Sequence, residues 1–252
     1  MMRRPLIAAN WKMHKTIGEA VDYARRVVPL IKGVADVDKL IAPSFTALSA
    51  VSSALAGSGI LVAAQDVFYE EKGAFTGEIS PSMVKDAGGS FVIVGHSERR
   101  QFFGETDTIV NKKAKAALKA GLGVILCMGE TLEERNTNRT FDVIKRQVVE
   151  GLSEFSADEF KNTVLAYEPI WAIGTGVTAT PAQAEEAHGF IRSIVKEIYG
   201  GVADDLRILY GGSVKPENID DIMARPNVDG ALVGGDSLDP QVFSKLVMYK
   251  RG

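Results

Sequence analysis

The chain has little cysteine, no long apolar run and no excess of positive charge. Its single cysteine, Cys127, excludes an internal disulfide and is typical of a reducing compartment. No stretch approaches the roughly 20 apolar residues of a membrane span. The formal net charge of −3 argues against a nucleic-acid-binding protein, whose surface would be basic.

The first four residues (MMRR) are basic, like the start of a secretory signal. The apolar run behind them stops at Asn10, short of the roughly 7–15 apolar residues that such a signal needs. We therefore expect a soluble, cytoplasmic protein. Cys127 lies inside an apolar run, so we expect a buried structural thiol rather than a nucleophile.

Eight short apolar runs recur along the chain, and each predicts a strand. They are uniformly apolar rather than alternating, which is the pattern of strands buried on both faces. Amphipathic stretches follow them, such as 17–31, whose apolar residues share one helical face. The predicted strands are 6–9, 39–42, 60–64, 91–94, 124–127, 164–167, 207–210 and 230–233.

Eight strand–helix units in 252 residues predict a closed (β/α)8 barrel, with eight parallel strands inside eight helices. Barrels of this α/β class routinely fill such a length as one domain, so we assign residues 1–252 to a single domain. A doubly wound open sheet is the structural alternative, although it rarely needs eight such units.

One connection, residues 66–78 (DVFYEEKGAFTGE), is longer than a barrel loop usually needs. It carries two phenylalanines and a tyrosine, which a solvated loop would not normally expose. Either this loop folds back on itself or it inserts into a partner chain.

In a barrel, functional groups lie where the strands reach their C-terminal ends. The residues at those positions are polar or glycine, which predicts one polar site at one rim. They are Asn10 and Lys12 after the first strand, His96 after the fourth, Glu168 after the sixth, Gly211, Gly212 and Ser213 after the seventh, and Gly234 and Gly235 after the eighth.

Glu168 directly follows a buried strand and precedes Pro169, which fixes its backbone. The apolar loop behind it ends in Gly174-Thr175-Gly176 and has the composition of a lid with a glycine hinge. Trp171 in this loop is most simply lid packing. A carboxylate under an apolar lid can be dehydrated, which changes its basicity.

The glycine pairs 211–212 and 234–235 suit a phosphate site, because backbone N–H groups without a nearby Cβ approach an anion closely. A single pair would more simply be a tight turn. Two pairs after the last two strands match the recurrent phosphate position of this architecture.

His96 precedes Ser97, which we expect to cap a short helix through Arg100. The positive end of that helix disfavours an imidazolium and leaves a neutral ring that donates a hydrogen bond. Lys12, placed between Trp11 and Met13 after a buried strand, predicts a cation directed into the site. With no second His or Cys at ligand spacing, we expect no metal site.

Glu98 is either an exposed acid in a charged turn or a partner of Lys12 inside the site. Glu168 as base, His96 as neutral electrophile and Lys12 as fixed charge would together abstract a proton beside a carbonyl and stabilise the enediolate that forms. Return of the proton to the neighbouring carbon gives aldose–ketose isomerisation, with no cofactor and with phosphate held by the glycines.

Four segments of the chain resemble the triosephosphate isomerase family: 10–13 (NWKM), 95–100 (GHSERR), 166–176 (AYEPIWAIGTG) and 210–214 (YGGSV). The resemblance runs from the first strand to Gly235. It implies interconversion of dihydroxyacetone phosphate and D-glyceraldehyde 3-phosphate, in glycolysis and gluconeogenesis. It also implies that Glu168 transfers the proton and that His96 is the electrophile. The implied substrate contacts are Asn10, Lys12, Gly174, Ser213, Gly234 and Gly235.

The same resemblance implies that Tyr210 and Ser213 hold the closed lid through the backbone near Gly176 and Ala179. It further implies a homodimer in which the loop 66–78 enters a pocket of the second subunit. Thr76 would then lie near the partner's Asn10, and Met13 and Phe75 would be interface residues.

Two lid residues depart from the family pattern, because Ile170 and Val177 stand where we expect valine and lysine. We expect these departures to leave the chemistry unchanged and to bear only on the rates of lid opening and closing. Two other functions remain open. One is a barrel isomerase for a longer sugar phosphate, which has no need of residues 95–98 together with the lid. The other is a non-catalytic phosphate-metabolite-binding barrel, which should have lost Glu168.

Overall fold

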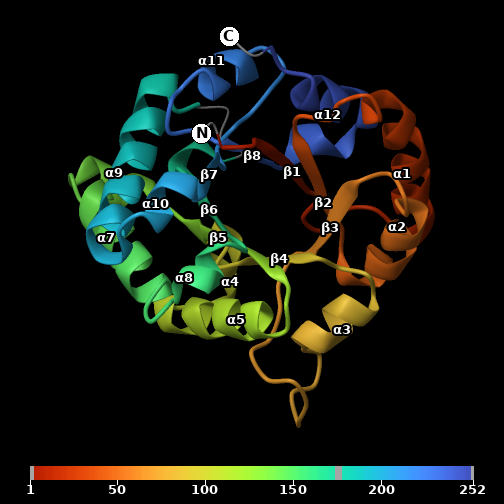
Figure 1. The fold of residues 1–252 in the computed structure, drawn as a ribbon, viewed down its shortest axis with the longest axis horizontal. Helices are drawn as coiled ribbons and strands as arrows, with labels where there is room; N and C mark the ends of the chain where they lie inside the picture. The colour runs from red at the N-terminus through yellow and green to blue at the C-terminus, as the bar shows by residue number, and fades with distance from the viewer. Residues whose placement is uncertain (1–2, 174–177, 251–252) are drawn as a thin grey trace.

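All eight predicted strands form one closed parallel barrel, with neighbours in the order β1 to β8 (Figure 1). The computed structural model describes residues 3–173 and 178–250. Pairing of β8 with β1, for example of Ala231 with Ile7, closes the sheet and excludes the open-sheet alternative. The strands are β1 (Leu6–Asn10), β2 (Asp38–Ala42), β3 (Ile60–Ala64), β4 (Phe91–Val94), β5 (Gly123–Met128), β6 (Thr163–Tyr167), β7 (Arg207–Tyr210) and β8 (Gly230–Val233).

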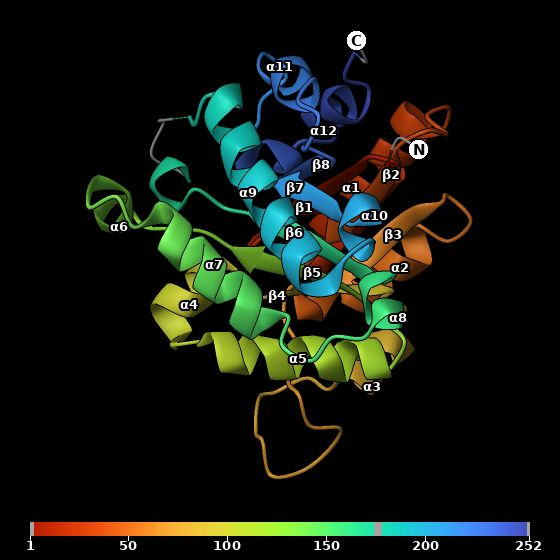
Figure 2. The ribbon, with the colours of Figure 1, turned by 60° about the vertical axis from the view of Figure 1, so that its left-hand side comes forward.

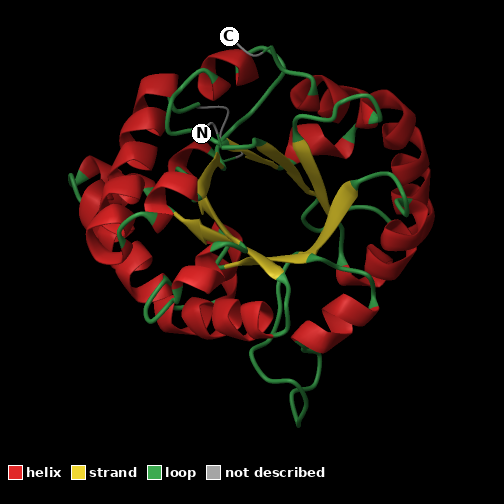
Figure 3. Cartoon of the chain, in the orientation of Figure 1, coloured by secondary structure: helices red, strands yellow, loops and turns green. Residues whose placement is uncertain are grey.

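Helices surround the barrel (Figure 3), and several connections carry short helices besides the main one. The helix predicted over 17–31 is confirmed as α1. Thr180 caps the N-terminus of α9, and Gly200, with a φ of 69°, caps its C-terminus. The helices are α1 (Ile17–Ile31), α2 (Leu48–Ala54), α3 (Pro81–Asp86), α4 (Ser97–Phe103), α5 (Asp107–Lys119), α6 (Leu132–Asn136), α7 (Thr140–Gly151), α8 (Ala157–Phe160), α9 (Pro181–Tyr199), α10 (Val202–Asp205), α11 (Ile219–Met223) and α12 (Pro240–Val247), with 3₁₀ turns η1 (Phe45–Ala47), η2 (Ile170–Ala172) and η3 (Gly235–Leu238). None of the described helices is both long and apolar enough to cross a bilayer.

The apolar core has two layers because successive strand residues point to opposite faces. Leu6 and Ala8 belong to the cluster inside the barrel, whereas Ile7 and Ala9 pack in the layer between the sheet and the helices. Both faces are therefore dry, which explains the uniformly apolar runs. Cys127 lies in the inner cluster as a free, buried thiol, and this confirms the structural interpretation of that residue.

The loop 66–78 projects away from the barrel between β3 and α3 (Figures 1 and 2). Its aromatic side chains contact one another: the ring centroids of Phe68 and Tyr69 are 4.2 Å apart, and those of Phe68 and Phe75 are 4.7 Å apart. The loop therefore packs on itself, as the first of the two interpretations predicted. Its insertion into a partner stays a prediction.

Candidate active site

A cavity of about 300 Å³ opens at the rim where the strands reach their C-terminal ends. Most of the predicted site residues meet there, contributed by the ends of five strands. Those lining it are Asn10, Lys12, His96, Glu168, Ser213, Gly234 and Gly235. Ile173 and Gly211 line it as well. Gly174, the remaining predicted substrate contact, lies outside the described residues, as do Gly176 and Val177.

Glu168 and His96 form a buried pair. Oε1 of Glu168 lies 2.9 Å from Nε2 of His96, and Oε2 accepts a hydrogen bond of 2.9 Å from the backbone N–H of Ser97. Glu168 is 2% exposed and His96 is 5% exposed. Both carboxylate oxygens are thus held by donors from the loop after β4, and the carboxylate is fixed in the resting site.

The helix cap at this loop differs from the prediction. His96, not Ser97, is the N-cap of α4, and the helix runs to Phe103 rather than to Arg100. Gly95 has a φ of 66° and turns the chain two residues before the predicted cap, directly before His96. The Nδ1 atom of His96 accepts a 3.3 Å hydrogen bond from the backbone N–H of Glu98. In a neutral ring the proton therefore resides on Nε2, facing Glu168.

The two members of the pair shift each other's pKa in opposite directions. Burial lowers the pKa of His96, but the charge of Glu168 and the hydrogen bond to it outweigh burial, so the net direction is upward. Burial raises the pKa of Glu168, and the charge and hydrogen bond of His96 reverse that effect and leave it lowered. When Glu168 leaves His96, burial, the charge of Lys12 and the helix N-terminus favour the neutral ring, and only the charge of Glu98 still opposes them.

Lys12 is held in a strained backbone conformation with a φ of 52°. Its N–H donates to Oδ1 of Asn10 at 3.0 Å, and its carbonyl accepts from Nε2 of Gln65 at 2.8 Å. The ammonium donates to Oε1 of Glu98 at 2.7 Å, which confirms the predicted pairing of these two residues. The strain and the three contacts together aim the cation into the cavity.

Glycines at the rim create space for the site. A Cβ on Gly211 would lie 2.8 Å from Cγ of Glu168, and one on Gly234 would lie 3.3 Å from Cε of Lys12. Among the described residues, the backbone N–H of Gly234 donates to no acceptor. Gly235 begins η3, and the first N–H groups of such a turn have no partner within it. These N–H groups are free to meet an anion.

Two buried tyrosines, Tyr167 and Tyr210, lie near the described ends of the lid. The indole N–H of Trp171 and the hydroxyl of Tyr167 both donate to the carboxylate of Glu130, at 2.9 Å and 3.1 Å. Burial raises the pKa of Tyr210 to about 12, and the neighbouring backbone of Ala179 opposes that shift. The Tyr210 hydroxyl nevertheless has no hydrogen-bond partner among the described residues, so its link to the lid near Ala179 stays a prediction.

Sequence reasoning missed several residues that shape the site: Gln65, Gly129, Glu130 and Gln147. Gly129 and Glu130 directly follow β5, so the rule that selected the other rim residues would also have found them. Gln65 directly follows β3, so the same rule would have found it too. Gln147 lies within α7 and has no local signal, because its contact is with distant backbone.

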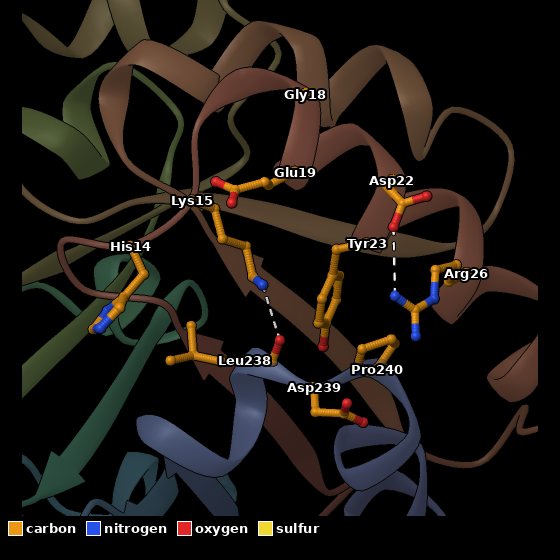
Figure 4. A pocket seen from close by; sticks show the side chains of 10 residues that line it. All are labelled: His14, Lys15, Gly18, Glu19, Asp22, Tyr23, Arg26, Leu238, Asp239 and Pro240. Atoms are coloured by element: carbon orange, nitrogen blue, oxygen red, sulfur yellow. Dashed lines mark hydrogen bonds and ion pairs between the residues drawn. The ribbon is translucent and has the colours of Figure 1, made fainter.

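A second cavity, of about 630 Å³, lies between α1 and α12 (Figure 4). Its charged groups already have partners in the protein. Nζ of Lys15 donates to the carbonyl of Leu238 at 2.9 Å, Arg26 contacts Asp22 at 3.4 Å, and Asp239 caps α12. The larger volume therefore offers no set of convergent, unused polar groups comparable to that at the barrel rim.

Comparisons with known proteins all indicate the same family. A family model described as triosephosphate isomerase matches residues 5–250. The triosephosphate isomerase of Trichlorobacter lovleyi is 56% identical over 250 residues, covering 99% of this chain and 100% of that protein. That of Geotalea uraniireducens is 55% identical over 249 residues, covering 98% and 99%.

A solved structure of triosephosphate isomerase from Bartonella henselae superimposes with a TM-score of 0.89 at 40% identity, covering 98% of this chain and 100% of that one. Fold, rim geometry and sequence therefore agree: the chain belongs to the triosephosphate isomerase family.

Proposed function

We propose that this protein interconverts dihydroxyacetone phosphate and D-glyceraldehyde 3-phosphate, with Glu168 as the base. The observation that carries the proposal is the convergence of three groups on one cavity. The carboxylate of Glu168, the Nε2–H of His96 and the ammonium of Lys12 all line it, and the glycines of the rim form its end. An isomerase acting on a carbonyl needs these three kinds of group.

In this mechanism the carboxylate of Glu168 breaks the C–H bond beside the substrate carbonyl and takes the proton. The electron pair moves onto the carbonyl oxygen, where the Nε2–H of His96 and the ammonium of Lys12 stabilise the negative charge. Return of the proton to the neighbouring carbon completes the isomerisation. Glu168 must leave the hydrogen bonds to His96 and Ser97 to reach the substrate, and this frees Nε2–H for the oxygen.

The phosphate group of the substrate is assigned to Ser213, Gly234 and Gly235. The unpartnered backbone N–H of Gly234 and the start of η3 supply donors, and Lys12 supplies positive charge at the same end. Asn10 is assigned to the substrate as well, because its side-chain oxygen accepts from the N–H of Lys12 and its N–H₂ group donates to no other group in the described part of the chain. Gly174 remains a proposed contact from the lid.

The cavity volume favours a small substrate over a longer sugar phosphate. About 300 Å³ is at the lower end of the range for ligand pockets, and a triose phosphate is a small ligand. The non-catalytic alternative is disfavoured because Glu168 is retained, is 2% exposed and contacts His96.

The test is the rate of conversion of D-glyceraldehyde 3-phosphate in chelator-treated buffer with no added cofactor. Fast turnover that is lost in Glu168→Gln supports both the reaction and its base. Absence of turnover by folded protein would contradict the proposal, and a panel of longer sugar phosphates would follow. In cells the reaction would serve glycolysis and, in reverse, gluconeogenesis, in the cytoplasm, where the free Cys127 stays reduced.

We also propose that the protein is a homodimer. Met13, which follows β1, is 94% exposed in the single chain, and Phe75, within the projecting loop 66–78, is 42% exposed. Large exposed apolar groups of this kind mark interaction surfaces. In the dimer the loop 66–78 would enter the second subunit, with Thr76 near the partner's Asn10.

A further inference from the structure

The backbone around Glu168 lies against three residues: Met128, which ends β5, and Gly129 and Glu130, which follow it. The N–H of Glu168 donates to the carbonyl of Met128 at 2.7 Å, and the N–H of Ile170 donates to the carbonyl of Glu130 at 3.1 Å. Gly129 lies between these two bonds. A Cβ built on Gly129 would be 1.8 Å from the carbonyl oxygen of Glu168, so only glycine permits this approach.

The backbone groups of Gly129 are bonded to a side chain. Oε1 of Gln147 accepts from the N–H of Gly129 at 2.8 Å, and Nε2 of Gln147 donates to the carbonyl of Gly129 at 3.2 Å. Gln147 is on α7 and is 4% exposed. Pairing between β4 and β5 ends at Val94 and Leu126, so the amide of Gln147 takes the place that a strand neighbour would have.

We propose that Gln147 is a positioning residue for the carboxylate of Glu168 and that it acts through Gly129. This inference rests on the proposed function, in which Glu168 is the base. Gly129 contacts the main chain of Glu168 without any side chain between them, so a shift of Gly129 moves the carboxylate directly. A base must lie within hydrogen-bond reach of the proton that it removes, and a displacement of about 1 Å can reduce a rate by 10²-fold.

The same segment also reaches the lid. Glu130 follows Gly129, is fully buried, and accepts hydrogen bonds from Trp171 and Tyr167. Gln147 therefore fixes the centre of a strip, Met128 to Glu130, that supports both the base and the first turn of the lid. Loss of the two amide hydrogen bonds leaves the buried N–H and carbonyl of Gly129 without partners. A shift of the backbone would then bring them to new partners.

The test compares two nearly isosteric variants. Gln147→Met removes both hydrogen bonds while keeping the volume. Gln147→Glu restores both, because burial favours the neutral acid, whose O–H donates and whose C=O accepts. We expect kcat for D-glyceraldehyde 3-phosphate to fall about 10- to 100-fold in Gln147→Met and to recover most of that loss in Gln147→Glu. KM and inhibition by inorganic phosphate should change less than twofold in both.

Asn111→Leu is the matched control for a purely structural amide. Nδ2 of Asn111 donates to the carbonyls of Gly151 and Ser153, both at 3.0 Å, and Asn111 does not line the active-site cavity. This variant should lower Tm and leave kcat unchanged. Native kcat in folded Gln147→Met, or an equal loss of kcat in Asn111→Leu, would overturn the proposal.

A second measurement does not depend on turnover. The contact with Glu168 raises the pKa of His96, so the pKa of His96, followed by NMR of the imidazole, reports the position of the carboxylate. We expect it to fall in Gln147→Met and to stay unchanged in Asn111→Leu. An unchanged pKa in Gln147→Met overturns the positioning role even if the wild-type chain has another substrate, whereas absence of wild-type turnover contradicts only the proposed function.

Discussion

Nε2 of His96 lies 2.9 Å from Oε1 of Glu168, so the proposed electrophile and the proposed base are hydrogen-bonded to each other. Each group occupies the position that the substrate would take beside the other. Substrate binding therefore has to separate them, and separation changes both pKa values. The carboxylate loses the charge and the donor that keep its pKa low, and the imidazole loses the charge that keeps its pKa high.

Replacement of Glu168 by glutamine should lower kcat by about 10²- to 10⁴-fold, the usual contribution of a general base. The amide keeps the shape of the side chain but cannot take the proton. Steady-state kinetics with D-glyceraldehyde 3-phosphate measures the loss. Inhibition by inorganic phosphate should be unchanged, because the phosphate end of the cavity is formed by other residues. A variant with near-native kcat would remove Glu168 as the base.

The same substitution should lower the pKa of His96. In Glu168→Gln the negative charge is absent, and burial, which lowers the pKa of His96, is no longer opposed by it. The imidazole then stays neutral to a lower pH, which an NMR titration of its ring protons detects. If the pKa of His96 were the same in both proteins, the contact seen between the two side chains would not persist in solution.

Replacement of Gly234 by valine should weaken phosphate binding. The added Cβ would lie 3.3 Å from Cε of Lys12, so the larger side chain would displace the lysine and screen the backbone N–H. Loss of one hydrogen bond to a charged group is worth about 1.5–3 kcal/mol, or roughly 10- to 100-fold in affinity. Inhibition by inorganic phosphate measures it. Gly201→Ala, where an added Cβ meets nothing within 4 Å, is the control; unchanged affinity in Gly234→Val would place the phosphate elsewhere.

The sequence was most informative where burial and chain direction act together. Strands buried on both faces require uniformly apolar runs, and so all eight could be located within one residue of their observed ends. Because the strands are parallel, the residues that follow their C-terminal ends lie at one rim of the barrel. This rule brought Lys12, His96 and Glu168 into one predicted site.

Contacts between distant backbone and side chains could not be predicted. Gln147 looks like any polar residue of a helix, and its bonds to Gly129 depend on how α7 packs on the end of β5. The prediction of Ser97 as the cap of α4 was wrong for a local reason. Serine is the better cap by propensity, but the left-handed Gly95 turns the chain early and gives the position to His96.

Replacement of Met13 by glutamate should shift the proposed homodimer toward monomer. Met13 is 94% exposed in the single chain, and burial of an unpaired charge in an interface would cost about 3 kcal/mol or more, which weakens association more than 10²-fold. Sedimentation velocity at several concentrations measures the change. Met248→Glu, at a methionine that is 50% exposed near the end of α12, should leave association unaltered. Equal sedimentation of wild type and Met13→Glu would contradict the assigned interface.

Acid should destabilise the fold through His188, which is fully buried in α9. Its Nδ1 faces the carbonyl of Asn227 at 3.1 Å, its ring packs against Tyr167, and burial lowers its pKa from 6.5 to about 3. Below about pH 6.5 this histidine binds a proton in the unfolded chain but not in the folded chain. The stabilisation that the neutral, buried ring contributes is therefore fully present above that pH and is lost as pH falls toward 3. Between pH 7 and pH 5 we expect a loss of about 2 kcal/mol in the free energy of unfolding.

The variant His188→Asn isolates this contribution, because the asparagine amide keeps a donor for Asn227 but does not titrate. Asp66 acts with the opposite sign: burial raises its pKa to about 6, so its ionisation destabilises the fold as pH rises toward 7. The wild-type curve therefore contains both effects, whereas the difference between wild type and variant contains only that of His188. Urea denaturation at pH 5 and pH 7 should show the difference shrinking by about 2 kcal/mol at the lower pH. A difference between wild type and His188→Asn that stays constant from pH 7 to pH 5 would show that this imidazole is protonated within the fold.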